Sequence, residues 1–205
     1  MEIKVFYPED IPTLARKVSE VWKFEDSPEF TKVFCEYLVR SNYYTPEFSL
    51  KIVDEEGLQA IAFACMPDEE NDSEIWLQEQ LERLSPKIKK YILRSSAYTK
   101  RMDAELLKMM GPQSHAAKLS FFFSRKAGYG ALVLEHLVEK LRQQDVEWLY
   151  LWSDSWCNWQ YYQRHGFEQI GAKDSCLNSV QTMRNIIISC FVSRLDNICY
   201  FCRKI

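Results

Sequence analysis

The chain has 205 residues, of which 47% are hydrophobic and 27% are charged, enough for one domain with a sizeable core. Its net charge of −3 argues against a nucleic-acid-binding surface, and no apolar run approaches the length of a membrane span. The first residues lack the apolar segment of a signal peptide, and the seven cysteines do not form two metal-type pairs. We therefore expect a cytoplasmic protein with free thiols, and no metal, nucleic acid or membrane among its partners.

The first third of the chain predicts a strand, two helices and an antiparallel hairpin. Polar residues from Asp54 to Gly57 separate the two strand-like runs of the hairpin. Asp10 and Ser27 are placed to begin the helices, each with a proline close behind. In order, we expect a strand at 3–7, helices that begin at 10 and 27, and strands at 48–53 and 58–65.

Residues from about 67 to 117 predict a helical insertion between the hairpin and the next strand. A polar linker at 66–73 leads into three helical pieces, which stop at Gly111-Pro112. The insertion either extends the core or covers a substrate site. Its aromatic and methionine side chains suit both interpretations. The apolar positions of the three pieces fall within 76–84, 88–92 and 102–110.

The centre of the chain joins a strand to a helix through two glycines. The apolar run Leu119–Ser124 predicts the strand and residues 131–141 predict the helix, with Gly128 and Gly130 between them. The first N–H groups of a helix have no partner within it, and the helix dipole favours an anion there. The turn therefore predicts a phosphate site, to which the preceding Arg-Lys pair adds charge. Alternatively, the glycines serve only a tight connection.

A strand-like run at 146–153 completes a strand–helix–strand unit, whose two strands should be parallel. Cys199 and Cys202 fall on opposite sides of the last predicted strand, so we expect structural roles for them. Residues 172–196 fit either a helix or a strand, and we favour the helix. The other expected elements are a short helix at 157–165 and strands at 167–171 and 197–205.

Two motifs occur in the order and at the separation typical of one superfamily. The pattern Arg-x-x-Gly-x-Gly-Ala runs from Arg125 to Ala131, and Tyr-x-x-x-Gly-Phe runs from Tyr162 to Phe167. Over roughly residues 118–171 the chain therefore resembles the GNAT N-acetyltransferase superfamily. The resemblance implies one domain over 1–205 with an α/β fold of the GNAT type. Its mixed, largely antiparallel sheet would contain one splayed pair of parallel strands, and the helical insertion would be an addition to it.

The resemblance also implies an enzyme that transfers an acetyl group from acetyl-CoA to a primary amine by direct attack. The acceptor would be a small molecule or a peptide, and the protein a monomer or homodimer. Tyr162 is implied as the general acid that protonates the departing thiolate. A strand N–H near Phe122 could stabilise the oxyanion. The implied cofactor-binding residues are Phe122, Phe123, Ser124, Arg125, Lys126, Gly128, Tyr129, Gly130, Ala131 and Asn158.

These assignments have structural alternatives. Tyr162 could be a core tyrosine on a short helix, although its neighbour Tyr161 is the stronger candidate for the core. Asn158 could bond locally at the start of that helix. For the general base, Asp154, His115 and a chain of water molecules are all open choices.

Two departures from the family pattern bear on the cofactor. Ser124 runs directly into Arg125, where the family usually has a longer loop, and Lys126 stands where a glycine is common. Both changes could leave fewer N–H groups facing a phosphate. They motivate a second hypothesis, a GNAT-fold CoA-binding or catalytically degraded protein that acts as a binding or regulatory module. A third is an α/β protein that uses the turn for another phosphate ligand.

Overall fold

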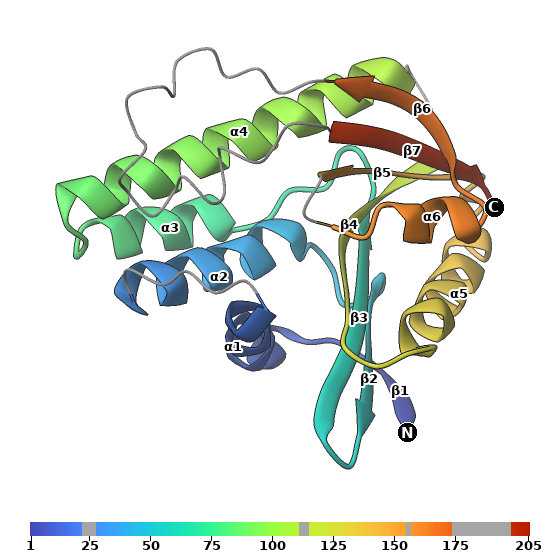
Figure 1. Ribbon diagram of the computed structural model, residues 1–205, viewed down its shortest axis with the longest axis horizontal. Helices are drawn as coiled ribbons and strands as arrows, with labels where there is room; N and C mark the ends of the chain where they lie inside the picture. Colours follow the sequence, from blue (N-terminus) through green and yellow to red (C-terminus); the bar gives the residue numbers. More distant parts are fainter. Residues whose placement is uncertain (22–27, 111–114, 155–156, 174–197) are drawn as a thin grey trace. The chain divides into compact units, whose positions relative to one another are not determined.

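The computed structural model describes residues 1–21, 28–110, 115–154, 157–173 and 198–205, as Figure 1 shows. These residues fall into two compact units. The first contains the described residues of Met1–Ser85 and His115–Leu149 with Ile205, and the second those of Pro86–Ser114 and Tyr150–Lys204. In the described part of the chain, no helix combines the length and the apolar character that crossing a membrane requires.

An antiparallel sheet forms the centre of the first unit. Its strands, in spatial order, are β1 (Glu2–Val5), β2 (Ser49–Asp54), β3 (Gly57–Cys65) and β4 (Ala116–Ser124). The predicted hairpin is confirmed, because β2 and β3 pair with Leu50 opposite Ala62, and Gly57 turns the chain with a φ of 89°. β3 is buried from Leu58 to Cys65, as expected for a strand with neighbours on both edges.

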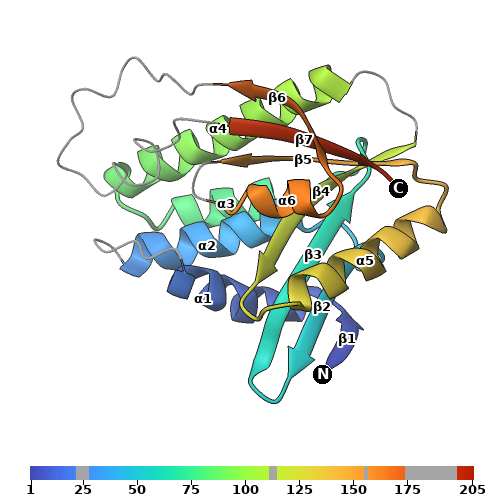
Figure 2. The same cartoon turned by 45° about the vertical axis from the view of Figure 1, so that its right-hand side comes forward.

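Helices cover both faces of this sheet. α1 (Ile11–Val21) and α2 (Pro28–Asn42) lie on one face, and α5 (Tyr129–Arg142) lies on the other (Figure 1 and Figure 2). A 3-10 turn, η1 (Pro8–Asp10), precedes α1, and α3 (Ser73–Leu81) packs beside α2. In α1 the buried residues recur at helical spacing and so lie on one face; they are Ile11, Leu14, Ala15 and Val18.

Aromatic rings fill the core between the sheet and the first two helices. The fully buried ring of Phe63 on β3 has its centroid 4.7 Å from that of Phe6 and 5.8 Å from that of Tyr43. Phe121 of β4 follows at 6.0 Å. Tilted and edge contacts of this kind add to the stabilisation from buried apolar area. This packing holds β4, which leads directly into the predicted phosphate turn.

The second unit contains a long helix, three strands and a short helix. They are α4 (Pro86–Met110), most of β5 (Trp148–Asp154), α6 (Gln160–Arg164), β6 (Glu168–Lys173) and β7 (Ile198–Lys204). β7 lies between β5 and β6 and pairs with β6 in the antiparallel sense. Tyr200 of β7 donates a hydrogen bond of 3.0 Å to Glu105, and Trp152 of β5 donates one of 2.6 Å to Asp103. These two bonds tie α4 to the strands of its own unit.

The prediction of three helical pieces in the insertion is wrong in one respect, because the second and third form one continuous helix, α4. No glycine or proline interrupts the chain after Pro86 until Gly111. The polar stretch in the middle of α4 keeps its helical bonds, and the Thr99 hydroxyl donates back to the Ser95 carbonyl at 3.1 Å. Small hydroxyl residues alone therefore do not end this helix.

Most of the C-terminal predictions are confirmed where the structure describes the chain. The helix expected at 157–165 is present as the shorter α6, and the strands expected at 167–171 and 197–205 are β6 and β7. For the segment 172–196 the sequence favours a helix, but its first two residues are strand residues of β6, so that expectation is wrong for them. Its remainder lies outside the described residues.

β4, α5 and the start of β5 form the predicted strand–helix–strand unit. The carbonyl of His115, just before β4, accepts the N–H of Glu147 at 2.8 Å and that of Trp148 at 3.1 Å. The two strands therefore begin side by side, as parallel neighbours do. At the other end of β4, buried Gly130 lets α5 approach closely, because a Cβ there would lie 3.0 Å from Cζ of Phe122.

Replacing Gly130 by alanine should destabilise the protein. At an exposed helix position this change would stabilise by about 1 kcal/mol. Here the added methyl group would also lie 3.2 Å from Cβ of Ser124, and forcing it in should cost roughly 1–3 kcal/mol. Urea unfolding of the two forms measures the difference. A variant as stable as wild type would contradict the close packing, and adding Phe122→Leu should recover part of the loss.

Candidate functional site

The turn between β4 and α5 is anchored to the sheet and shaped by a glycine. The N–H of Arg125 donates to the Gln59 carbonyl of β3 at 2.9 Å, which continues the pairing of β3 with β4. Gly128 then precedes α5 with a φ of 83°, in the left-handed region that glycine adopts without strain. The glycines therefore do make a tight connection, and its geometry determines which backbone groups the turn exposes.

The turn and the start of α5 present backbone donors for which the described part of the chain supplies no acceptor. The N–H of Tyr129 is occupied, since it donates to the Lys126 carbonyl at 3.2 Å. Within the described residues, no acceptor is found for the N–H groups of Lys126, Ala127, Gly128, Gly130 and Ala131. The dipole of α5 adds partial positive charge at the same end. Unused N–H groups at a helix start are suited to an anion such as phosphate.

Asp54, the last residue of β2, ties the hairpin to this turn. Its Oδ2 accepts hydrogen bonds from Lys126 Nζ at 2.8 Å and from the Tyr129 hydroxyl at 3.3 Å. Its Oδ1 accepts from the N–H of Glu56 at 2.9 Å and from Gln59 Nε2 at 3.0 Å. With only 8% of its side chain exposed, the carboxylate is a nearly buried acceptor of several donors. It holds the side chains that flank the turn in fixed positions.

The cations beside the turn are paired with carboxylates. The hydrogen bond from Lys126 lowers the pKa of Asp54 to about 2, and the same bond raises the pKa of Lys126. Arg125 donates from Nη1 to Glu20 of α1 at 2.6 Å. The two positive charges expected beside the phosphate site are therefore largely compensated, which leaves the backbone N–H groups as the main attraction for an anion.

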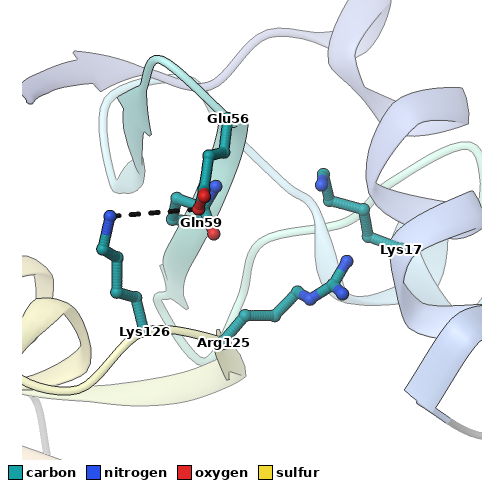
Figure 3. A pocket seen from close by; sticks show the side chains of 5 residues that line it. All are labelled: Lys17, Glu56, Gln59, Arg125 and Lys126. Carbon is teal, nitrogen blue, oxygen red and sulfur yellow. Dashed lines mark ion pairs between the residues drawn. The ribbon is translucent and has the colours of Figure 1, made fainter.

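A pocket of about 510 Å³ adjoins the first residues of the turn. Figure 3 shows its lining, in which Lys17 of α1 lies across from Arg125 of the turn. Lys126, Glu56 and Gln59 complete the lining. Arg125 and Lys126 are already paired with carboxylates, so Lys17 supplies most of the positive charge that an anionic group would meet in this pocket.

Two predicted site residues lie in the second unit, and Tyr162 is one of them. Its side chain is 9% exposed, and its ring centroid lies 5.7 Å from those of Phe167 and Phe201. Tyr161 is less buried and stacks on the ring of His165 at 3.9 Å. The expectation that Tyr161 is the stronger core candidate is therefore wrong, because α6 turns Tyr162 toward the two phenylalanines.

Of the other polar candidates, Asn158 and His115 have more open surroundings. Asn158 is exposed and lies just before α6, where its carbonyl accepts the Tyr161 N–H at 2.9 Å. His115 is exposed, and its Nδ1 lies 3.1 Å from the Asp145 carbonyl oxygen. Asp154 is the last residue of β5. In the part of the chain that the structure describes, no group of three or more His, Cys, Asp or Glu residues could hold a metal ion.

The structure brings most of the predicted cofactor residues together at one junction. Those from Phe122 to Ala131 lie at the end of β4 and the start of α5, whereas Asn158 and Tyr162 lie in the second unit. Sequence reasoning missed the role of Asp54, which is 72 positions from its partner in the turn. It also missed Lys17. No local spacing links either residue to the glycine motif, so only the fold reveals them.

Acid should lower the stability of the folded protein, because it protonates the carboxylate of Asp54. Its pKa in the folded protein is about 2, below the ordinary value of 3.8. The stabilisation from the charged carboxylate is therefore complete above about pH 4 and is lost as the pH falls toward 2. Asp54→Asn should be less stable than wild type near neutral pH, and this difference should narrow in acid. Thermal unfolding across the pH range measures it.

Glu55→Gln is the matched control for that variant, because it removes one negative charge from an exposed neighbour. It should unfold at nearly the wild-type temperature throughout. A difference between Asp54→Asn and wild type that does not change with pH would contradict the ion pair with Lys126.

Comparison with known proteins gives matches in structure but not in sequence. No protein-family model and no curated protein matches the chain. An aminoglycoside 6'-acetyltransferase type Ii matches with 11% identity over 100% of this chain and 97% of that chain, at a TM-score of 0.54. The ribosomal-protein-S18-alanine N-acetyltransferase of Escherichia coli matches with 14% identity over 100% of this chain and 93% of that chain, at 0.51. A GNAT-family acetyltransferase of Streptococcus pneumoniae matches with 14% identity over 100% and 98%, at 0.50.

These three proteins are acetyltransferases. At such low identity the likeness concerns the fold, and it extends over the whole chain. The predicted α/β fold with a mixed, largely antiparallel sheet is confirmed. The chain has the fold of the GNAT acetyltransferases.

Proposed function

We propose that this protein is an N-acetyltransferase that transfers an acetyl group from acetyl-CoA to a primary amine. The observation that carries the proposal is the set of unused N–H groups at the start of α5, behind the left-handed Gly128. In a GNAT fold, such a site is suited to the pyrophosphate of coenzyme A. Solved structures with this fold include enzymes named for a protein alanine and for aminoglycosides, so the acceptor class is a peptide or a small molecule.

The backbone would bind the cofactor in two ways. The pyrophosphate would accept hydrogen bonds from the N–H groups of Lys126 to Ala131, in the field of the α5 dipole. The pantetheine arm carries two amides, which can pair with the edge of β4 near Phe122, Phe123 and Ser124 as an added strand would. Because Arg125 and Lys126 are already paired with carboxylates, we expect affinity to depend more on backbone donors than on side-chain charge.

The chemistry is direct acyl transfer. The neutral amine attacks the thioester carbonyl, and the tetrahedral oxyanion collapses with cleavage of the carbon–sulfur bond. The amine loses its proton to water, and the CoA thiolate gains one from the Tyr162 hydroxyl. With ordinary pKa values of about 10 for tyrosine and about 8.5 for a thiol, this proton transfer is uphill by about 1.5 pKa units, a modest cost for a donor that is hydrogen-bonded to the sulfur while the carbon–sulfur bond breaks, and water then returns a proton to Tyr162. Asn158 would contact the pantetheine or the pyrophosphate.

Tyr162→Phe should lower kcat by roughly tenfold to a thousandfold and leave the affinity for acetyl-CoA nearly unchanged, because it removes only the acidic proton. Release of free thiol from acetyl-CoA in the presence of a panel of primary amines measures kcat, and calorimetry measures the affinity. Tyr161→Phe removes the neighbouring hydroxyl and should retain activity. Full turnover in Tyr162→Phe would remove Tyr162 from the mechanism.

A second candidate function is a CoA-binding module without turnover. The carboxylates of Asp54 and Glu20 favour it, because they compensate the cations that would otherwise attract the cofactor. The same thiol-release measurement separates the two functions. Steady turnover with any primary amine supports the transferase, whereas saturable binding of acetyl-CoA without turnover across the panel supports the module.

A further inference from the structure

One of the three cations that line the pocket beside the turn has no carboxylate partner in the part of the chain that the structure describes. Lys17 of α1 is half-buried, and among the described residues its ammonium group has no ion-pair partner. Across the pocket, Arg125 uses Nη1 for Glu20, which leaves its other N–H groups for a further acceptor. Gln59, only 5% exposed, also lines the pocket. Unneutralised positive charge is therefore concentrated on the side of Lys17.

A phosphate monoester matches this chemistry. It carries close to two negative charges and three acceptor oxygens, which an ammonium group and a guanidinium fork can bind together. The volume of about 510 Å³ exceeds what a phosphate group alone needs. It lies within the range of about 300–1,000 Å³ that is common for small-molecule sites. The pocket can therefore hold a phosphate together with part of the molecule that carries it.

We infer that this pocket holds the phosphate monoester on the ribose of coenzyme A, with Lys17 and Arg125 as its principal contacts. The inference rests on the proposed function. Coenzyme A carries a pyrophosphate and a ribose 3'-phosphate on one nucleotide. Arg125 and Lys126 belong both to the turn that would bind the pyrophosphate and to the lining of the pocket. The two places are therefore neighbours, as binding of a single nucleotide requires.

Glu56 opposes this binding and provides a second variant with the reverse effect. Its side chain is 75% exposed, and its Oε2 lies 3.9 Å from Lys126 Nζ. A solvated carboxylate reduces the positive potential of the pocket without abolishing it. Removing its charge should strengthen the binding of a phosphate monoester, whereas removing the charge of Lys17 should weaken it.

Calorimetric titration of the full chain with CoA and with dephospho-CoA tests the inference, because the two ligands differ only in the ribose phosphate. Wild type should bind CoA roughly tenfold more tightly. Lys17→Met should reduce this preference about threefold to tenfold by weakening CoA alone, and Lys17→Arg should retain most of it. Glu56→Gln should increase the preference. Lys32→Met, an exposed lysine of α2 outside the pocket lining, is the matched control and should leave it unchanged.

The outcomes separate the inference from the proposed function. An unchanged preference in Lys17→Met, or an equal loss of affinity for both ligands, overturns the inference while cofactor binding stands. Wild-type protein that binds neither ligand overturns both. Thermal unfolding without ligand shows whether each variant is folded. Because Lys17→Arg and Glu56→Gln are mild changes, their expected effects keep the inference testable even if Lys17→Met is unstable.

Discussion

The packing of α5 on β4 at Gly130 is the constraint on which the proposed site depends. A Cβ atom at this position would lie 3.0 Å from Cζ of Phe122 and 3.2 Å from Cβ of Ser124, so glycine lets the helix start close to the strand without displacing these side chains. Gly128 makes the matching turn with its positive φ. Together they leave a short row of N–H groups at the helix start without an acceptor among the described residues. The local backbone conformation therefore creates an anion site before any charged side chain takes part.

The charged residues around this site have a different role from the one their sequence suggests. An Arg-Lys pair before a glycine turn predicts direct attraction of phosphate, but Lys126 is bound to Asp54 and Arg125 to Glu20. These bonds position the turn against the hairpin and α1, at the cost of local positive charge. Lys17, from a helix far away in sequence, is the pocket cation with which no carboxylate of the described residues pairs. An anion would therefore be bound mainly by backbone N–H groups of the turn, and in addition by Lys17, which the fold brings close to the turn.

The features that could be predicted from the sequence are those that depend on residues close together in the chain. The hairpin and the buried face of α5 each depend on residues within a few positions, and both predictions are confirmed. The contact of Asp54 with the turn depends on how the hairpin lies beside β4, which no local pattern encodes. The continuity of α4 was not predicted, although no glycine or proline interrupts the helix and the Thr99 hydroxyl bonds back to the Ser95 carbonyl.

The central claim is that the unused N–H groups of the turn bind the pyrophosphate of acetyl-CoA. Backbone amide NMR spectra recorded during a titration with acetyl-CoA test it most directly. Binding at this turn should cause large, saturable shifts in the amide signals of Lys126, Ala127, Gly128, Gly130 and Ala131. If these amide signals do not shift at millimolar acetyl-CoA, or if shifts appear only elsewhere in the protein, the cofactor does not bind at this turn and the central claim is wrong.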